Sequence, residues 1–291
     1  MPANQTSTAG LDLTRVQGWM FDVDGCLSQT SAAGGENGSL FEGAREVVTL
    51  LQSARQRVVC CTNASGRAPG VYAQGLRQMG LPIPDEDFLT AGGSAARVVA
   101  TQHPGGTAVV LGGEGVLAPL RRLAGDVEVL DAEAPEAARA DVVVVSAAHA
   151  YTSRQFDVAC RAVVSGAAFY VTVQQPWFYG GQERAASATS GVAQGIAWVT
   201  GVAPEIVGKP SSAAADMVLG QLGLEPAEVV MVGDGLEAEI AMASLIGAQS
   251  IWVQTGAPED SARGHLPTPT LALDSVADML PILRRHFKED S

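Results

Sequence analysis

Aromatic residues are scarce in this sequence of 291 residues, in which Phe, Trp and Tyr together make up 5%. Hydrophobic residues nevertheless account for 47%, so the chain can bury a sizeable core. That core must be built mainly from Ala, Val and Leu, a composition typical of helices packed on a parallel sheet. The length allows one large domain or two ordinary ones.

Basic residues are also few, and the formal net charge at pH 7 is −13. We therefore expect no nucleic-acid or membrane partner, because both surfaces require clustered Lys and Arg. No uninterrupted apolar run reaches the roughly 18 residues of a membrane span, and the polar start of the chain does not resemble a signal peptide. The four cysteines, Cys26, Cys60, Cys61 and Cys160, lack zinc-ligand or disulfide spacing. They predict buried, reduced thiols in a cytoplasmic protein.

Two carboxylates, Asp22 and Asp24, lie one residue apart after an apolar run at 16–20 that predicts a buried strand. Gly25 follows, where the backbone can turn sharply. In an open α/β sheet, ligands gather at the carboxyl ends of strands, and adjacent carboxylates repel unless a cation or a shared proton intervenes. Because Mg²⁺ prefers oxygen ligands and phosphate partners, the pair indicates a magnesium site. The alternative is a pair of solvated acids at a strand end.

Strand-like and helix-like segments alternate along the whole chain. The apolar runs predict strands at 57–61, 107–111, 142–145, 167–173, 228–232 and 249–253. The helical periodicity predicts helices at 43–55, 69–79, 93–102, 116–123, 153–164, 188–200 and 275–287, the last bent at Pro281. This alternation favours an α/β fold with a parallel sheet. A Gly-rich connection at 30–39 is expected to be flexible and close to the acid pair.

Three further polar signals fall at strand ends or helix starts. Thr62 and Asn63 follow a predicted strand, Lys209 precedes a helix start, and Asp234 lies in a Gly-Asp-Gly break after another strand. In a parallel sheet such positions share one edge. With the acid pair they contain what phosphoryl transfer needs: a carboxylate nucleophile, an acid/base, a cation, donors and metal ligands.

Two other segments invite an interpretation. The Gly-rich turn at 112–115 lacks the spacing of a dinucleotide-binding loop, so we interpret it as a plain strand–turn–helix. The segment 174–181 concentrates three aromatic side chains, including Trp177 and Phe178. This cluster is either a minor core contact or a wall of the substrate site.

The order of the motifs resembles the haloacid dehalogenase-like superfamily of phosphohydrolases. Residues 21–25 resemble its first motif, Asp-x-Asp-Gly, and 62–65 resemble its second. Lys209 is similar to the third motif, and 233–240 to the fourth. The likeness extends over nearly the whole chain, which makes it more specific than any single motif.

The long insertion between the second and third motifs is similar to the type-IIA branch, which is NagD-like and p-nitrophenyl phosphatase-like. This resemblance implies a Rossmann-like, doubly wound parallel sheet core at 1–83 and 204–291. A C2-type α/β cap domain would be inserted at 84–203. The segments 112–115 and 207–210 also look like this branch.

The resemblance implies a role for each acid. Asp22 would attack phosphorus and form an aspartyl-phosphate, while Asp24 would serve as general acid and then general base. Asp22, Asp24 (through its backbone carbonyl), Asp234 and Glu239 would ligate Mg²⁺. Glu239 stands where the branch usually has Asp.

The resemblance also implies the groups that bind the substrate. Thr62 and Asn63 would hold phosphoryl oxygens, and Lys209 would neutralise charge on the nucleophile and the phosphoryl group. Gln175 stands where the branch commonly has an Asp close to the substrate. Apart from the resemblance, Trp177 would bind the substrate if the aromatic cluster is a wall of its site. Ala64 replaces a second Asn that is common in the branch.

We therefore expect a Mg²⁺-dependent phosphatase for small phosphorylated metabolites, with the cap deciding the substrate. Dehalogenase chemistry is disfavoured by Asp24 and Asp234, and mutase action is left undecided. The alternative of another class is a non-catalytic or weakly active phosphate-ligand binder. Sugar phosphates, nucleotides, phosphoglycolate and pyridoxal phosphate all stay open as substrates, as does a homodimer through the cap.

Overall fold

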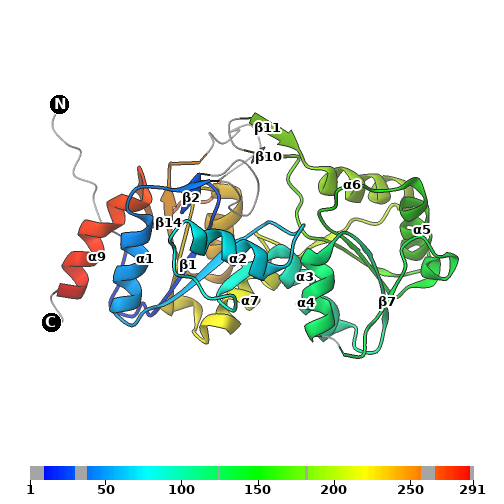
Figure 1. Ribbon diagram of the computed structural model, residues 1–291, viewed down its shortest axis with the longest axis horizontal. Coiled ribbons are helices and arrows are strands. Elements are labelled where there is room, and N and C mark those ends of the chain that lie inside the picture. Colours follow the sequence, from blue (N-terminus) through cyan, green and yellow to red (C-terminus); the bar gives the residue numbers. More distant parts are fainter. Residues whose placement is uncertain (1–9, 30–37, 124, 181–182, 257–265, 289–291) are drawn as a thin grey trace.

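The protein is described by a computed structural model that covers 10–29, 38–123, 125–180, 183–256 and 266–288. Two lobes lie side by side, each built around a parallel sheet with helices on its faces (Figure 1). We call the lobe with the six-stranded sheet the core and the lobe with the five-stranded sheet the cap.

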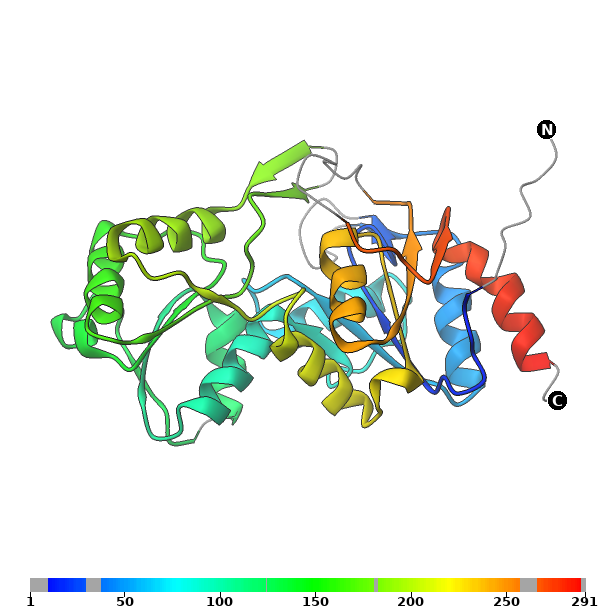
Figure 2. The same cartoon turned by 180° about the vertical axis from the view of Figure 1, so that it is seen from behind.

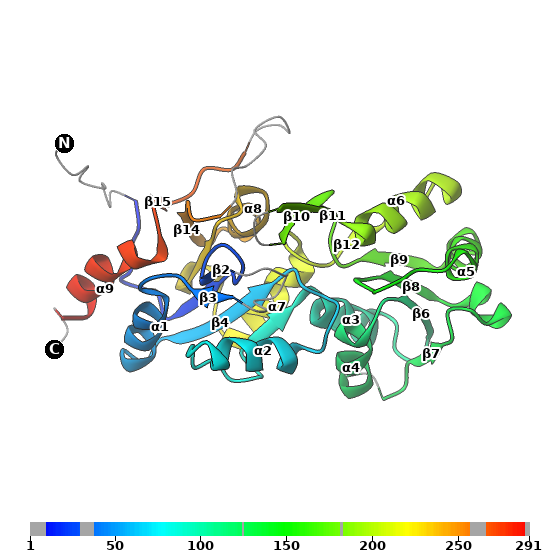
Figure 3. The ribbon, with the colours of Figure 1, turned by 45° about the horizontal axis from the view of Figure 1, so that its top comes forward.

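The core sheet is parallel throughout, in the order β15-β14-β13-β1-β4-β5. Its strands, in chain order, are β1 (Gly18–Phe21), β4 (Arg57–Thr62), β5 (Phe88–Thr90), β13 (Val229–Gly233), β14 (Gln249–Val253) and β15 (Leu271–Leu273). Its helices are α1 (Ala44–Ser53), α2 (Pro69–Gln78), α7 (Ser212–Leu222), α8 (Ala241–Ile246) and α9 (Met279–Lys288). Two short strands, β2 (Ser28–Gln29) and β3 (Ser39–Leu40), pair antiparallel beside β1 (Figure 3).

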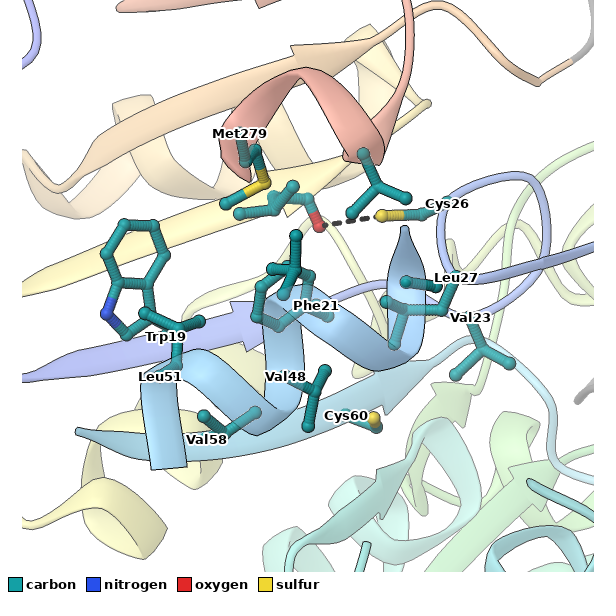
Figure 4. Close-up of a cluster of buried hydrophobic side chains, with 14 of the residues drawn as sticks. Trp19, Phe21, Val23, Cys26, Leu27, Val48, Leu51, Val58, Cys60 and Met279 are labelled. Atoms are coloured by element: carbon teal, nitrogen blue, oxygen red, sulfur yellow. Dashed lines mark hydrogen bonds between the residues drawn. The ribbon is translucent and has the colours of Figure 1, made fainter. Parts of the chain in front are cut away.

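The side chains of β1 point alternately to the two faces of the core sheet, and helices cover both faces. Trp19 and Phe21 belong to the hydrophobic cluster shared with α1, α2 and α9, shown in Figure 4. Met20, between them, belongs to the cluster shared with α7 and α8. All three side chains are fully buried, and burying a large apolar side chain contributes roughly 1.5–3 kcal/mol relative to exposure. The central strand that carries the acid pair is therefore fixed from both sides.

The cap repeats this layered design on a smaller scale. Its parallel sheet has the order β12-β9-β8-β6-β7. The strands, in chain order, are β6 (Thr107–Leu111), β7 (Glu128–Leu130), β8 (Val142–Val145), β9 (Ala168–Val171) and β12 (Glu205–Ile206). Two of its helices, α3 (Ala91–Gln102) and α4 (Glu114–Leu123), pack on one face, and α5 (Ser153–Val164) and α6 (Ala188–Thr200) pack on the other (Figure 2).

An antiparallel hairpin of β10 (Trp177–Gly180) and β11 (Glu183–Ala186) follows the cap strand β9. It extends from the cap toward the side of the core where β2 and α8 lie (Figures 1 and 3). The aromatic segment thus contains the first strand of a hairpin, and Trp177 and Phe178 are 45% and 41% exposed.

The predicted fold class, a doubly wound parallel core with an inserted α/β cap, is confirmed. The domain boundaries stay a prediction; strand pairing passes to the cap sheet after Thr90 and returns to the core sheet after Ile206. Pro281, expected to bend the last helix, lies in the first turn of α9, where its missing N–H costs no intrahelical hydrogen bond. The Gly-rich connection expected at 30–39 falls largely outside the described residues.

Candidate active site

Three carboxylates, two of them from strand ends, converge at the carboxyl edge of the core sheet. Asp22 directly follows β1, and Asp234 directly follows the neighbouring strand β13. Oxygen atoms of Asp22, Asp234 and Glu239 lie within 4.8 Å of one another. Asp22 and Glu239 are buried, so their charges are poorly screened by water.

The Lys209 ammonium group lies between two of these carboxylates. It donates to Asp22 Oδ1, contacts Glu239 Oε1 at 2.7 Å and donates to the backbone carbonyl of Cys61 at 2.5 Å. Only 2% of the side chain is exposed. Its three donors therefore all meet oxygen atoms, as a buried ammonium requires.

Glu239 reaches the site from a short π-helical turn at Leu236–Ile240, which precedes α8. The chain after Gly235 thus begins with a wide turn and not with an ordinary α-helical one. The wide turn lets the Glu239 carboxylate accept a hydrogen bond from the Gly235 N–H at 3.0 Å, and such turns are frequent at functional sites. The longer side chain thus folds back toward the strand end.

Burial raises the pKa of Asp22 to about 7, although the neighbouring Lys209 ammonium opposes the shift. Burial, followed by the charges of Asp22 and Glu239, raises the pKa of Asp234 well above its ordinary range. Burial would lower the pKa of Lys209, but the same two carboxylates hold it well above its usual value. One ammonium thus faces three acids that repel one another.

The second motif holds Lys209 in place through its backbone. The Asn63 carboxamide accepts from Lys209 N at 2.8 Å and donates to Lys209 O at 2.9 Å. The buried Thr62 hydroxyl accepts the Ala64 N–H at 3.1 Å, so its own proton can be donated to a ligand. Ala64 is buried, and its methyl group occupies the position of the expected second Asn.

Asp24 and the turn after it lie beside Asp234. Asp24 is partly exposed, and its negative charge contributes to the raised pKa of Asp22. Gly25 has a φ of 91°, and a Cβ there would clash with the Asp234 carboxylate. Glycine at this position therefore permits both the left-handed turn and the close approach of the acid.

Two further contacts in the candidate site were missed by sequence reasoning. The Trp252 indole N–H donates to the Asp234 carbonyl at 2.9 Å, and the Thr255 hydroxyl donates to the Gly25 carbonyl at 2.5 Å. Both residues lie in or just after β14, beside the strand that carries Asp234. Applying the strand-end rule to the end of 249–253 would have indicated Thr255.

The two predicted substrate-binding residues of the cap, Gln175 and Trp177, lie in the sequence between the second and third motifs. Gln175 is half-buried between β9 and β10, and its backbone carbonyl accepts from the Ser190 hydroxyl at 2.7 Å. Trp177 starts the exposed hairpin. Their contact with a substrate stays a prediction, as do the roles of the other site residues.

The donor set suits a hard divalent cation. Carboxylate oxygens from Asp22, Asp234 and Glu239 are the ligand type that Mg²⁺ and Ca²⁺ prefer. A divalent cation would balance the charge that Lys209 leaves uncompensated. The residues present therefore fit the expected metal.

Comparison with known proteins agrees with this geometry. A model of the haloacid dehalogenase-like hydrolases matches residues 19–124, and a second model of hydrolases of the same kind matches 206–279. The chain belongs to the haloacid dehalogenase-like hydrolases.

Named relatives cover nearly the whole chain. An acid sugar phosphatase of Staphylococcus epidermidis is 29% identical over 89% of this chain and 95% of its own length. The 5'-nucleotidase YutF of Bacillus subtilis is 27% identical over 92% and 98%, respectively. A p-nitrophenyl phosphatase structure from Archaeoglobus fulgidus superposes with a TM-score of 0.79 at 24% identity, covering 92% of this chain and 99% of that one, and supports the fold.

These findings confirm two predictions from the sequence, the type-IIA branch and the class of phosphoric monoester hydrolases. Within the described residues, the helices are too short or too polar to cross a membrane.

Proposed function

We propose that the protein is a Mg²⁺-dependent phosphatase that hydrolyses small phosphorylated metabolites through a phosphorylated Asp22. The observation that carries this proposal is the Lys209 ammonium between the buried carboxylates of Asp22 and Glu239, with the half-buried Asp234 beside these acids at the edge of the core sheet. The named relatives, an acid sugar phosphatase and a 5'-nucleotidase, support a phosphate ester as the substrate.

Asp22 is the proposed nucleophile. Its Oδ1 accepts from Lys209 Nζ, and this ammonium favours the ionised carboxylate that attack requires, against the effect of burial. In the first step an Asp22 oxygen forms a bond to phosphorus while the bond to the leaving alkoxide breaks. In the second step water attacks phosphorus, and the phosphoryl group leaves Asp22 as orthophosphate.

Asp24 is the proposed proton carrier. Its partly exposed position, two residues beyond the nucleophile, leaves it accessible to the leaving oxygen and to water. It would give its proton to the leaving oxygen in the first step and accept a proton from the attacking water in the second. The two acids have different environments, since Asp22 is buried and Asp24 is not, and such a difference separates nucleophile from acid/base.

The phosphoryl oxygens would be held by donors from the second and third motifs. Lys209 would place its charge beside them, and Thr62 would donate its hydroxyl proton. Asn63 would act mainly by fixing the Lys209 backbone, because its carboxamide already bonds there. Mg²⁺, when held by the three carboxylates, supplies charge stabilisation for the transferring phosphoryl group.

The test is phosphate release from a panel of phosphorylated metabolites and p-nitrophenyl phosphate, with Mg²⁺ and with chelator. We expect release that chelator abolishes, with one metabolite hydrolysed far faster than the rest. A folded, Mg²⁺-loaded protein that binds orthophosphate yet releases none from any ester would instead be the phosphate-ligand binder.

A further inference from the structure

We propose that Ser65 is a positioning residue that ties the loop of the second motif to the cap. The inference rests on the proposed function, because this loop carries Thr62, which would hold a phosphoryl oxygen, and Asn63, which fixes the Lys209 backbone. Ser65 was not among the predicted site residues. Its chemistry is that of a buried hydroxyl with partners on the other lobe.

The Ser65 side chain meets two cap strands where they end. Its hydroxyl lies 3.0 Å from the Thr172 hydroxyl, directly after β9, and accepts the Ala147 N–H at 3.2 Å, two residues after β8. The Ser146 hydroxyl donates to the Ser65 carbonyl at 3.0 Å. One residue of the core loop is thus bonded to three residues of the cap.

The three hydroxyl groups in these contacts are buried. Ser65 is 2% exposed, and Ser146 and Thr172 are 0% exposed. A buried hydroxyl or N–H that loses its partner pays a desolvation penalty larger than the net gain of an ordinary hydrogen bond. The contacts therefore resist separation, and each group depends on the others.

Two glycines let the backbones of the lobes meet at this point. A Cβ on Gly115, in the first turn of α4, would clash with the Ser65 carbonyl. A Cβ on Gly208 would clash with the Thr172 carbonyl and would lie 2.8 Å from Asn63 Oδ1. Both segments, 112–115 and 207–210, therefore work as packing surfaces around the second-motif loop.

The loop is consequently held from two directions. On the core side, Asn63 is bonded to the Lys209 backbone. On the cap side, Ser65 is bonded to the ends of β8 and β9. Because only Ala64 separates these anchors, a shift of the cap strands is transmitted to the phosphate-binding end of the loop. The cap thus orients the phosphate-binding groups of the loop.

The test compares Ser65→Ala with a matched control, Ser250→Ala. Ser250 is a buried core serine whose hydroxyl accepts the Thr270 N–H at 3.2 Å, the same distance and kind of bond that Ser65 makes with Ala147. Both variants should lose similar thermal stability. Only Ser65→Ala should lower kcat for p-nitrophenyl phosphate and weaken inhibition by orthophosphate, each by roughly tenfold.

Variants of Thr172, the hydroxyl partner of Ser65, provide a second, independent test. Thr172→Val removes the hydroxyl at nearly constant size and should match Ser65→Ala, whereas Thr172→Ser should stay within about twofold of wild type. The double variant Ser65→Ala/Thr172→Val should lose no more than the worse single variant, because the two hydroxyls act as one unit.

Amide hydrogen exchange provides a readout that needs no turnover. Ser65→Ala should accelerate exchange at Ala147 and across 62–67, and Ser250→Ala should not. If the wild-type protein shows no phosphatase activity, the proposed function is refuted. The exchange data still test whether Ser65 ties the loop to the cap. Equal kcat, orthophosphate inhibition and exchange in Ser65→Ala and Ser250→Ala would overturn the inference.

Discussion

Replacing Lys209 by Met removes the one ammonium held among the buried carboxylates. The side chain is 2% exposed, and its Nζ contacts Asp22, Glu239 and the Cys61 carbonyl. Methionine has a similar length but no charge, so the apolar part of the side chain stays packed. The substitution therefore isolates the electrostatic contribution of the ammonium.

The magnitude follows from the burial of the partners. Removing one member of a buried ion pair costs about 3–5 kcal/mol, because the remaining charge is left without compensation. Here Asp22 and Glu239 lose the same partner, but Asp22 can bind a proton to limit the loss. We expect the free energy of unfolding to fall by about 3–5 kcal/mol at pH 8 and by clearly less at pH 5, which lies below the pKa of about 7 of Asp22.

Urea unfolding with and without Mg²⁺ measures this effect. Saturating Mg²⁺ should restore part of the lost stability, because a bound cation supplies the missing positive charge. The matched control is Arg121→Met, which removes an exposed pair with Glu114 at 2.8 Å and should change stability little at either pH. A Lys209→Met variant no less stable than Arg121→Met at pH 8 would refute the electrostatic argument.

Three further predictions concern the carboxylate site. Gly25→Ala should weaken Mg²⁺ binding by at least about tenfold in calorimetry, because its Cβ clashes with Asp234. The control is Gly166→Ala, at a φ of 104° with nothing within 4 Å of the added Cβ, which should add backbone strain without changing Mg²⁺ binding. Equal Mg²⁺ affinities of the two variants would contradict this prediction. The pKa of Asp22 is raised from 3.8 to about 7, so metal-free protein should lose stability as pH rises through that window; Mg²⁺ binding near pH 6 should release protons, seen as a buffer-dependent heat, and a buffer-independent heat would count against the shift. Trp252→Phe should cost roughly 1 kcal/mol of stability by removing the hydrogen bond to Asp234 and should weaken Mg²⁺ binding; unchanged values of both would show that the contact is incidental.

Much of the fold could be predicted because its elements are long and periodic. The segments 142–145 and 153–164 begin and end where the apolar and helical patterns place them. The three-residue strand β15 was missed because so short a segment has no detectable period. Its place in the sheet is decided by pairing with β14, which is a tertiary interaction.

The site could be predicted only as far as strand ends allow. Asp22, Asp234 and Lys209 come together because parallel strands share one edge. The π-helical turn that carries Glu239 could not be inferred, because it depends on the hydrogen bond back to Gly235. Ser65 was also missed, because its partners come from the cap and are more than 80 residues away in sequence.

The most direct test of the central claim is to locate the covalent phosphate. The Asp24→Asn variant, mixed with p-nitrophenyl phosphate and Mg²⁺ and quenched in acid, should show a burst of about one p-nitrophenolate per protein, because this leaving group needs little protonation while hydrolysis of the phosphoaspartate needs the base. Mass spectrometry should find the phosphate on the peptide that contains Asp22. The double variant Asp22→Asn/Asp24→Asn should show neither burst nor phosphopeptide. A burst that survives the loss of the Asp22 carboxylate, or a phosphate on another residue, would contradict the account.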